Sequence, residues 1–157
     1  MKLFLEDNSV FEGESFGADV PMTGEVVFST GMTGYVESLT DPSFAGQILV
    51  CTYPLIGNYG VPSPDAFESE KIQIAGLVVT EYSVEYSHHD AVQSLAQWLK
   101  KNNIPAITGV DTRAITKKLR ERGVMLGALG HDKPSEFIDP NRTNLVAKVS
   151  PKQVRTY

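Results

Sequence analysis

The sequence contains very little cysteine and no long apolar run. One cysteine in 157 residues excludes an internal disulfide and is typical of a reducing cytoplasm. No apolar stretch approaches the roughly 18 residues that a membrane span needs, and Glu6 and Asp7 place acidic charge too early for a secretory signal peptide. The sequence therefore predicts a cytoplasmic chain that does not associate with a membrane.

Basic charge is also scarce, and no phosphate-binding loop is present. Fourteen Lys and Arg residues stand against nineteen Asp and Glu residues, a net charge of −5. Nucleic-acid-binding proteins need a basic footprint, so we expect no nucleic acid as a partner. The Gly-x-x-x-x-Gly-Lys pattern is absent, so any ATP must be used by a partner, and we expect no cofactor in this domain.

The residue types that carry catalysis and metal binding occur without the patterns that those functions need. Cys51 sits in an apolar run and lacks the flanking glycines of a nucleophile turn, so we predict a buried structural thiol and no catalytic residue. His88 and His89 are adjacent at a predicted helix start, where their rings should point in different directions. No cysteine or carboxylate cluster accompanies them at zinc spacing, so we predict no metal site.

Hydrophobic periodicity predicts an α/β fold. A hairpin over 2–14 and a strand over 26–30 indicate a mostly antiparallel layer. Later strands alternate with helices, which indicates right-handed crossovers and a parallel strand–helix–strand part. We therefore expect three layers, two of strands and one of helices. The expected later strands are 47–52, 72–80, 104–110 and 124–129; the expected helices run from a capping box at 87–90 to 101 and over 112–122, with short ones at 35–39 and 144–148, and 53–70 is expected to be loop.

The segment from Gly24 to Gln47 combines a β-prone start with a glycine-punctuated polar loop. Thr30, Thr33, Thr40 and Ser43 bring hydroxyl groups close together in sequence, and Asp41-Pro42-Ser43 has the composition of a turn. Such a loop leaving a buried strand can form a ligand-facing rim. It can equally be a long connection, and spacing alone leaves both interpretations open.

Three motifs in order give this chain a family resemblance. The segments 24–47, 52–60 (Thr-Tyr-Pro-Leu-Ile-Gly-Asn-Tyr-Gly) and 109–123 resemble the N-terminal part of the carbamoyl-phosphate synthase small chain, the glutamine-hydrolysing subunit. The resemblance implies a swivelling β/β/α domain over residues 1–150. It also implies that 151–157 begin a linker to a class I glutaminase domain, which carries the Cys-His-Glu triad and is absent from this sequence.

The resemblance also implies a function for the whole enzyme. Glutamine, bicarbonate and two ATP give carbamoyl phosphate for arginine and pyrimidine synthesis, in a heterodimer whose large synthetase subunit uses the ATP and Mg²⁺. In the family, the serine of the Asp-Pro-Ser motif contacts glutamine across the domain boundary, which makes Ser43 the expected substrate-binding residue. We expect this domain to dock the large subunit and to be inactive alone.

Two alternatives stay open. The basic helix over 112–122 is either a solvated face or a docking surface for an acidic partner, for which the resemblance suggests the large subunit. The whole chain could instead be a free-standing β/β/α module, either a phosphohistidine carrier that uses His131 or an adaptor without catalytic activity.

Overall fold

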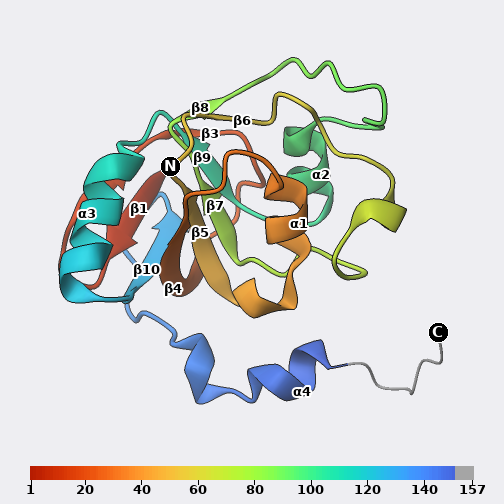
Figure 1. Cartoon of the computed structure of the whole chain (residues 1–157). Helices are drawn as coiled ribbons and strands as arrows, with labels where there is room; N and C mark the ends of the chain where they lie inside the picture. Colours follow the sequence, from red (N-terminus) through yellow and green to blue (C-terminus); the bar gives the residue numbers. More distant parts are fainter. Residues whose placement is uncertain (151–157) are drawn as a thin grey trace.

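One mixed sheet forms the framework of the protein. The structure is a computed structural model that describes residues 1–150, so the predicted linker at 151–157 lies outside the described residues. Within residues 1–150 the sheet has eight strands in the order β2-β1-β10-β4-β5-β7-β9-β3 (Figure 1). Their bounds are β1 Lys2–Leu5, β2 Val10–Glu12, β3 Glu14–Ser15, β4 Met22–Ser29, β5 Gln47–Cys51, β7 Gly76–Val78, β9 Ala106–Thr108 and β10 Met125–Gly130.

Strands β4, β5, β7 and β9 are parallel, and the remaining strands pair antiparallel on either side of them. A second, two-stranded parallel sheet pairs β6 (Leu55–Ile56) with β8 (Glu81–Tyr82). The helices are α1 Tyr35–Thr40, α2 Leu95–Lys101, α3 Thr112–Arg122 and α4 Leu145–Val149, with short 3-10 helices η1 Pro42–Phe44, η2 Pro64–Ala66 and η3 Pro140–Arg142. Among the described residues, every helix is too short or too polar to cross a membrane.

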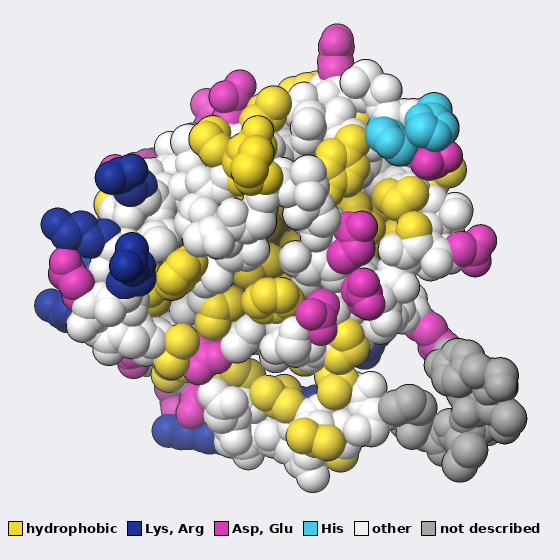
Figure 2. Space-filling view, in the orientation of Figure 1, with side chains coloured by type: hydrophobic (Ala, Val, Ile, Leu, Met, Phe, Trp, Pro, Cys, Tyr) yellow, Lys and Arg dark blue, Asp and Glu magenta, His cyan; other side chains and the backbone are white. Residues whose placement is uncertain are grey.

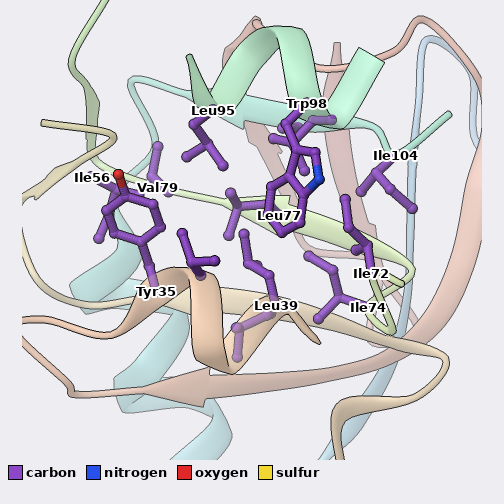
Figure 3. Packing of buried hydrophobic residues seen from close by; sticks show 14 of the residues in the cluster. Tyr35, Leu39, Ile56, Ile72, Ile74, Leu77, Val79, Leu95, Trp98 and Ile104 are labelled. Carbon is purple, nitrogen blue, oxygen red and sulfur yellow. The ribbon is translucent and has the colours of Figure 1, made fainter. Parts of the chain in front are cut away.

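The parallel strands bury both of their faces, which explains their continuous apolar runs. In β5, Leu49 and Cys51 point to one hydrophobic cluster, and Ile48 and Val50 point to the other. Helices α1 and α2 cover the first cluster, which includes Leu39 and Trp98 among other labelled side chains (Figure 3). Helix α3 packs against the second cluster through Ile115 and Leu119.

The sheet curls until its two edges nearly meet. Strands β2 and β3 lie at opposite ends of the strand order, yet only Gly13 separates them in sequence. The Gly13 N–H donates to the Met1 carbonyl at 3.1 Å, and β3 pairs antiparallel with β9. The second hydrophobic cluster therefore draws side chains from strands all around the curve, including β1, β4, β7, β9 and β10.

The predicted α/β class with antiparallel and parallel parts is confirmed, but three details are different. The antiparallel and parallel parts are joined in one continuous, curled sheet instead of forming separate sheets. Strand β10 lies between β1 and β4 and runs antiparallel to both, so the crossover through α3 does not join parallel strands. The range 53–70, expected to be loop, contains the short strand β6 and the 3-10 helix η2.

The predicted start of α2 at the Ser87–Asp90 capping box is also wrong. The helix begins at Leu95, and the capping box is formed by Ser94 and Gln97. The residues before the helix pair instead with Val61 in an antiparallel β-bridge: the Val92 N–H donates to the Val61 carbonyl at 2.9 Å, and the Val61 N–H donates to the Gln93 carbonyl at 2.9 Å. The predicted bounds of α3, by contrast, are correct, with Asp111 as N-cap and Gly123 at φ 88° after the last turn.

Candidate functional site

Ser43 lies on a stiff, exposed turn. It is the middle residue of η1, and its N–H donates to the Asp41 carboxylate at 2.8 Å, as the Asp-Pro-Ser composition predicts. Pro42 fixes the backbone at the first position of this turn. The Ser43 side chain is exposed, and its hydroxyl makes no hydrogen bond to any residue in 1–150. The hydroxyl is therefore free to bind a group from outside the domain.

A groove of about 360 Å³ lies beside Ser43, between η1 and the segment that carries α4. Its polar lining centres on Glu25, which accepts from Gln47 Nε2 at 2.6 Å and from Asn141 Nδ2 at 3.5 Å. Leu145 adds apolar surface on the α4 side. The Ser43 region is thus open, and core side chains do not seal it.

Helix α1, which leads into this turn, is held at its first residues by a side chain from a distant loop. The Tyr59 hydroxyl accepts hydrogen bonds from the N–H groups of Gly34 and Tyr35, both at 2.9 Å. The two tyrosine rings stack with centroids 4.1 Å apart. Burial raises the pKa of Tyr35, so its hydroxyl stays protonated and donates to the Gly60 carbonyl at 2.6 Å.

The last residue of α1 is fixed in a similar way. Thr40 is fully buried, and its hydroxyl donates to the Val36 carbonyl at 3.0 Å while accepting from the Glu68 N–H at 3.0 Å. The Ser69 hydroxyl donates to the Thr40 carbonyl. Both ends of α1 are therefore anchored to the segment 57–69, which makes the position of Ser43 well determined.

Cys51 occupies the structural position that the sequence predicts. Its side chain is buried at the end of β5 within the first hydrophobic cluster. Burial raises the pKa of the Cys51 thiol to about 12. A thiol that stays protonated at neutral pH is a poor nucleophile, so Cys51 has no catalytic environment here.

The histidines occupy exposed positions, and one expectation about them is wrong. The rings of His88 and His89 do not diverge but stack with centroids 4.4 Å apart, because no helix forms at this point. With Asp90 they form an exposed group whose ligand atoms lie within 4.8 Å of one another. Structural zinc sites use four protein ligands, whereas this group consists of His88, His89 and Asp90 with one ligand atom each. The absence of a metal from this domain stays a prediction.

His131, the residue of the phosphocarrier alternative, pairs with an unexpected partner. Its Nε2 lies 2.6 Å from the Asp19 carboxylate, and both side chains are exposed, at 64% and 73%. Asp132, the next residue in the chain, also carries a carboxylate, but the ring pairs with Asp19. An exposed histidine beside an exposed carboxylate is an ordinary surface pair, so this geometry gives no specific support to the carrier alternative.

Sequence reasoning missed Tyr59 and Glu25. Tyr59 stands in the second family motif, but its role depends on a contact across 24 residues to Tyr35. Glu25 belongs to a strand and meets Asn141 only through the fold, 116 residues away. No local pattern in the sequence indicates either contact.

The family assignment rests on a match over most of the chain. The model of the family "Carbamoyl-phosphate synthase small chain, CPSase domain" matches residues 3–129, which include β1 to β10 apart from one terminal residue at each end. The chain belongs to the carbamoyl-phosphate synthase small-chain family. The predicted resemblance is thereby confirmed.

Three relatives illustrate the range of this synthase family. The chain is 50% identical to the carbamoyl phosphate synthase arginine-specific small chain of Saccharomyces cerevisiae, covering 95% of this chain and 39% of that one. It is 51% identical to the multifunctional protein CAD of Squalus acanthias, and the match covers 99% of this chain and 7% of that protein. It is 48% identical to the mitochondrial carbamoyl-phosphate synthase [ammonia] of Aquarana catesbeiana, covering 99% and 11%.

The chain thus spans between 7% and 39% of the length of these synthase relatives. A solved aminopeptidase from Aneurinibacillus sp. strain AM-1 overlays with a TM-score of 0.46 at 15% identity, covering 82% of this chain and 29% of that one. That value is too low to support an argument about fold or function.

Proposed function

We propose that this chain is the N-terminal domain of a glutamine-using carbamoyl-phosphate synthase small chain and that Ser43 forms part of the glutamine site. The whole enzyme would form carbamoyl phosphate from glutamine, bicarbonate and two ATP, in the cytoplasm, for arginine and pyrimidine synthesis. Family membership over residues 3–129 supports the assignment to the small chain. The boundary at residue 150 and a following glutaminase domain belong to the same proposal.

The free hydroxyl of Ser43 is the observation that carries the glutamine contact. It projects from a proline-fixed turn next to an open groove, and it is left unpaired within residues 1–150. A short side chain on a fixed turn loses little entropy when it binds a polar ligand. The glutaminase domain would supply the nucleophilic cysteine, and Ser43 would hold the amino acid against it.

The remaining steps would belong to partners. The synthetase subunit would bind ATP and Mg²⁺, receive ammonia from the small chain and dock against this domain. The domain itself would hold no cofactor. It would contribute a stable support for the glutaminase domain and one wall of the substrate site.

Ser43→Ala in the full-length small chain, assembled with its synthetase partner, tests this role. Loss of one neutral hydrogen bond costs about 1 kcal/mol, so the KM for glutamine should rise about fivefold. Synthesis from added ammonia bypasses glutamine and should not change. Steady-state kinetics with each nitrogen donor measure both effects.

Ser63→Ala provides the matched control. Ser63 is also exposed and also lies next to the proline that begins a 3-10 helix: it precedes Pro64 of η2, whereas Ser43 follows Pro42 of η1. The Ser63 side chain makes no capping hydrogen bond. This variant should keep the KM of the unmodified enzyme. An unchanged KM for glutamine in Ser43→Ala would contradict the proposed contact.

A further inference from the structure

A second groove lies at the opposite end of the parallel strands. It has a volume of about 1200 Å³, and its lining includes Thr30, Thr52, Thr80 and Gly109. These residues follow the carboxyl ends of β4, β5, β7 and β9. In both open and closed α/β folds, ligands commonly bind at the carboxyl ends of the parallel strands. None of the residues that line the Ser43 groove takes part in it.

One wall of this groove is α3, whose five cations divide into two groups. Lys118 and Arg122 pair with the Asp7 carboxylate at 2.7 and 3.2 Å. Arg113, Lys117 and Arg120 line the groove, are exposed, and make no ion pair or hydrogen bond with any residue in 1–150. The first group has a structural partner, and the second group has none among the residues that the structure describes.

The three unpaired cations form a single row. They stand at i, i+4 and i+7, which places them along one side of the helix. Two carboxylates also line the groove, Asp111 and Glu121. Asp111 already accepts from the Ala114 N–H at 2.9 Å as the helix cap. The row is therefore a net positive strip beside a groove that also contains exposed apolar surface at Pro54.

The length of the row decides what kind of ligand it fits. Seven residues of α-helix span about 10.5 Å, so a single phosphate or carboxylate contacts all three side chains only if they converge on it. A ligand with several carboxylates along an extended backbone pairs with all three without that convergence. Figure 2 shows several Lys and Arg side chains over α3 with an acidic side chain among them, and a further basic group below α3.

The basic row on α3 contrasts with the net negative charge of the whole chain. Five of its fourteen basic residues lie in the eleven residues of α3, although the net charge is −5. An acidic partner is repelled by most of the surface and attracted at α3, which orients its approach.

We propose that the α3 row and its groove form a docking surface for an acidic segment of the synthetase chain. The identity of that partner rests on the proposed function, whereas the acidic chemistry of the segment rests on the cations of α3. Docking at this end leaves the Ser43 groove, at the other end of the strands, open to the glutaminase domain.

A peptide titration tests the chemistry of the surface. The 157-residue chain is titrated with a hexaglutamate peptide at low salt and at about 0.15 M salt, where charges are screened beyond about 8 Å. We expect binding at low salt that weakens at least fivefold at the higher salt. Arg113→Glu/Lys117→Glu should weaken binding at least tenfold, and the matched reversal Lys100→Glu/Lys101→Glu on exposed α2 positions should change it less than twofold.

Three outcomes of this titration would overturn the proposal: no peptide binding, equal losses in both double variants, or inorganic phosphate binding as tightly as the peptide. A circular dichroism spectrum of each variant checks that it is folded. The exposed positions of all four substituted residues make folding of both variants the expected result.

Association with the synthetase chain tests the identity of the partner. If the full-length small chain binds it and Arg113→Glu/Lys117→Glu binds at least tenfold more weakly, the proposal is supported. If the variant binds equally well, the docking surface is wrong and the proposed function stands. If the unmodified chain does not bind the synthetase at all, the proposed function is wrong, and so is the synthetase as the partner at α3. The peptide titration then tests separately whether α3 binds acidic segments.

Discussion

Asp7 joins the first hairpin to α3. One of its carboxylate oxygens accepts from the Ser9 N–H at 3.0 Å, and the other meets Lys118 and Arg122. Its side chain is only 10% exposed, and burial by itself would raise the pKa of Asp7. The hydrogen bonds from Lys118 and Ser9 outweigh burial and lower the pKa to about 2. Asp7 therefore stabilises the fold in its charged form.

This lowered pKa gives a pH-dependent contribution to stability with a defined sign. Because the folded pKa lies below the unfolded value of about 3.9, the contribution is complete above about pH 5 and is lost as pH falls towards 2. Asp7→Asn should lower the free energy of unfolding near pH 7 by on the order of 1 kcal/mol, after allowance for solvent screening. Urea unfolding of both proteins at pH 7 and pH 2.5 measures this difference in the free energy of unfolding. A difference of the same size at both pH values would contradict a stabilising role for the charged form of Asp7.

Cys51 offers a direct test of burial. Since the pKa of its thiol rises to about 12 from an ordinary 9, the thiolate fraction at pH 8 falls about a thousandfold. We expect a disulfide reagent to react with the native chain at least that much more slowly than with the urea-unfolded chain. We also expect no glutamine hydrolysis by the 157-residue chain. Turnover that disappears in Cys51→Ala would contradict both expectations.

Helix α1 depends on Tyr59 because its own sequence provides no cap. Gly34 precedes the helix with φ 79° and no side chain, and the Tyr59 hydroxyl accepts the first N–H groups instead. Tyr59→Phe removes these two hydrogen bonds and keeps the ring stack. We expect a loss of roughly 1–2 kcal/mol in the free energy of unfolding, as for loss of a helix cap.

Tyr53→Phe is the control for Tyr59→Phe. The Tyr53 hydroxyl makes no hydrogen bond within residues 1–150, so its removal should change stability by less than about 0.5 kcal/mol. Urea unfolding of both variants compares them. Equal stability of Tyr59→Phe and Tyr53→Phe would show that the Tyr59 hydroxyl is not the cap of α1.

The elements that sequence patterns predicted well are those fixed by local signals. Helix α3 has a side-chain cap at Asp111 and a glycine stop at Gly123, and both act within the helix itself. The start of α2 was wrong because two serine capping patterns lie seven residues apart and only tertiary pairing with Val61 decides between them. Because the helix begins at Leu95, Val92 lies before it, and its side chain is 63% exposed.

The same distinction applies to the candidate site. The Asp41–Ser43 turn follows from three adjacent residues and could be predicted. The groove beside it could not, because Glu25, Gln47 and Asn141 come from segments that meet only through sheet pairing and the return of the chain after β10. Sequence alone therefore predicted the turn that carries Ser43 but not the groove beside it.

Across the whole molecule, the two grooves lie at opposite ends of the same strands. Glu25 pairs with Gln47 at the Ser43 end, and Ser29 pairs with Cys51 at the α3 end. Four residues of strand separate these pairs, or about 13 Å. A glutaminase domain at one end and a synthetase segment at the other would not compete for space. The domain could then act as a rigid connector between them.

That rigidity depends on closure of the sheet at Gly13. A Cβ atom at this position would lie 2.6 Å from the Thr108 carbonyl oxygen and 2.7 Å from a methyl group of Val110. The carbonyl cannot move freely, because Thr108 pairs with Glu14 where β3 joins β9. Gly13→Ala should therefore strain the junction between the two edges and cost about 1–3 kcal/mol, as overpacking does elsewhere.

Gly31→Ala separates this steric effect from the general effect of replacing glycine. A Cβ at Gly31 would come no closer than 3.3 Å to its nearest neighbour, the Thr33 carbonyl oxygen, so we expect a change within about 0.5 kcal/mol. Urea unfolding of the two variants under one condition gives the comparison. Equal stabilities would mean that the edges of the sheet have room to separate at Gly13, and a connector with that freedom could not hold its two ends at a fixed distance.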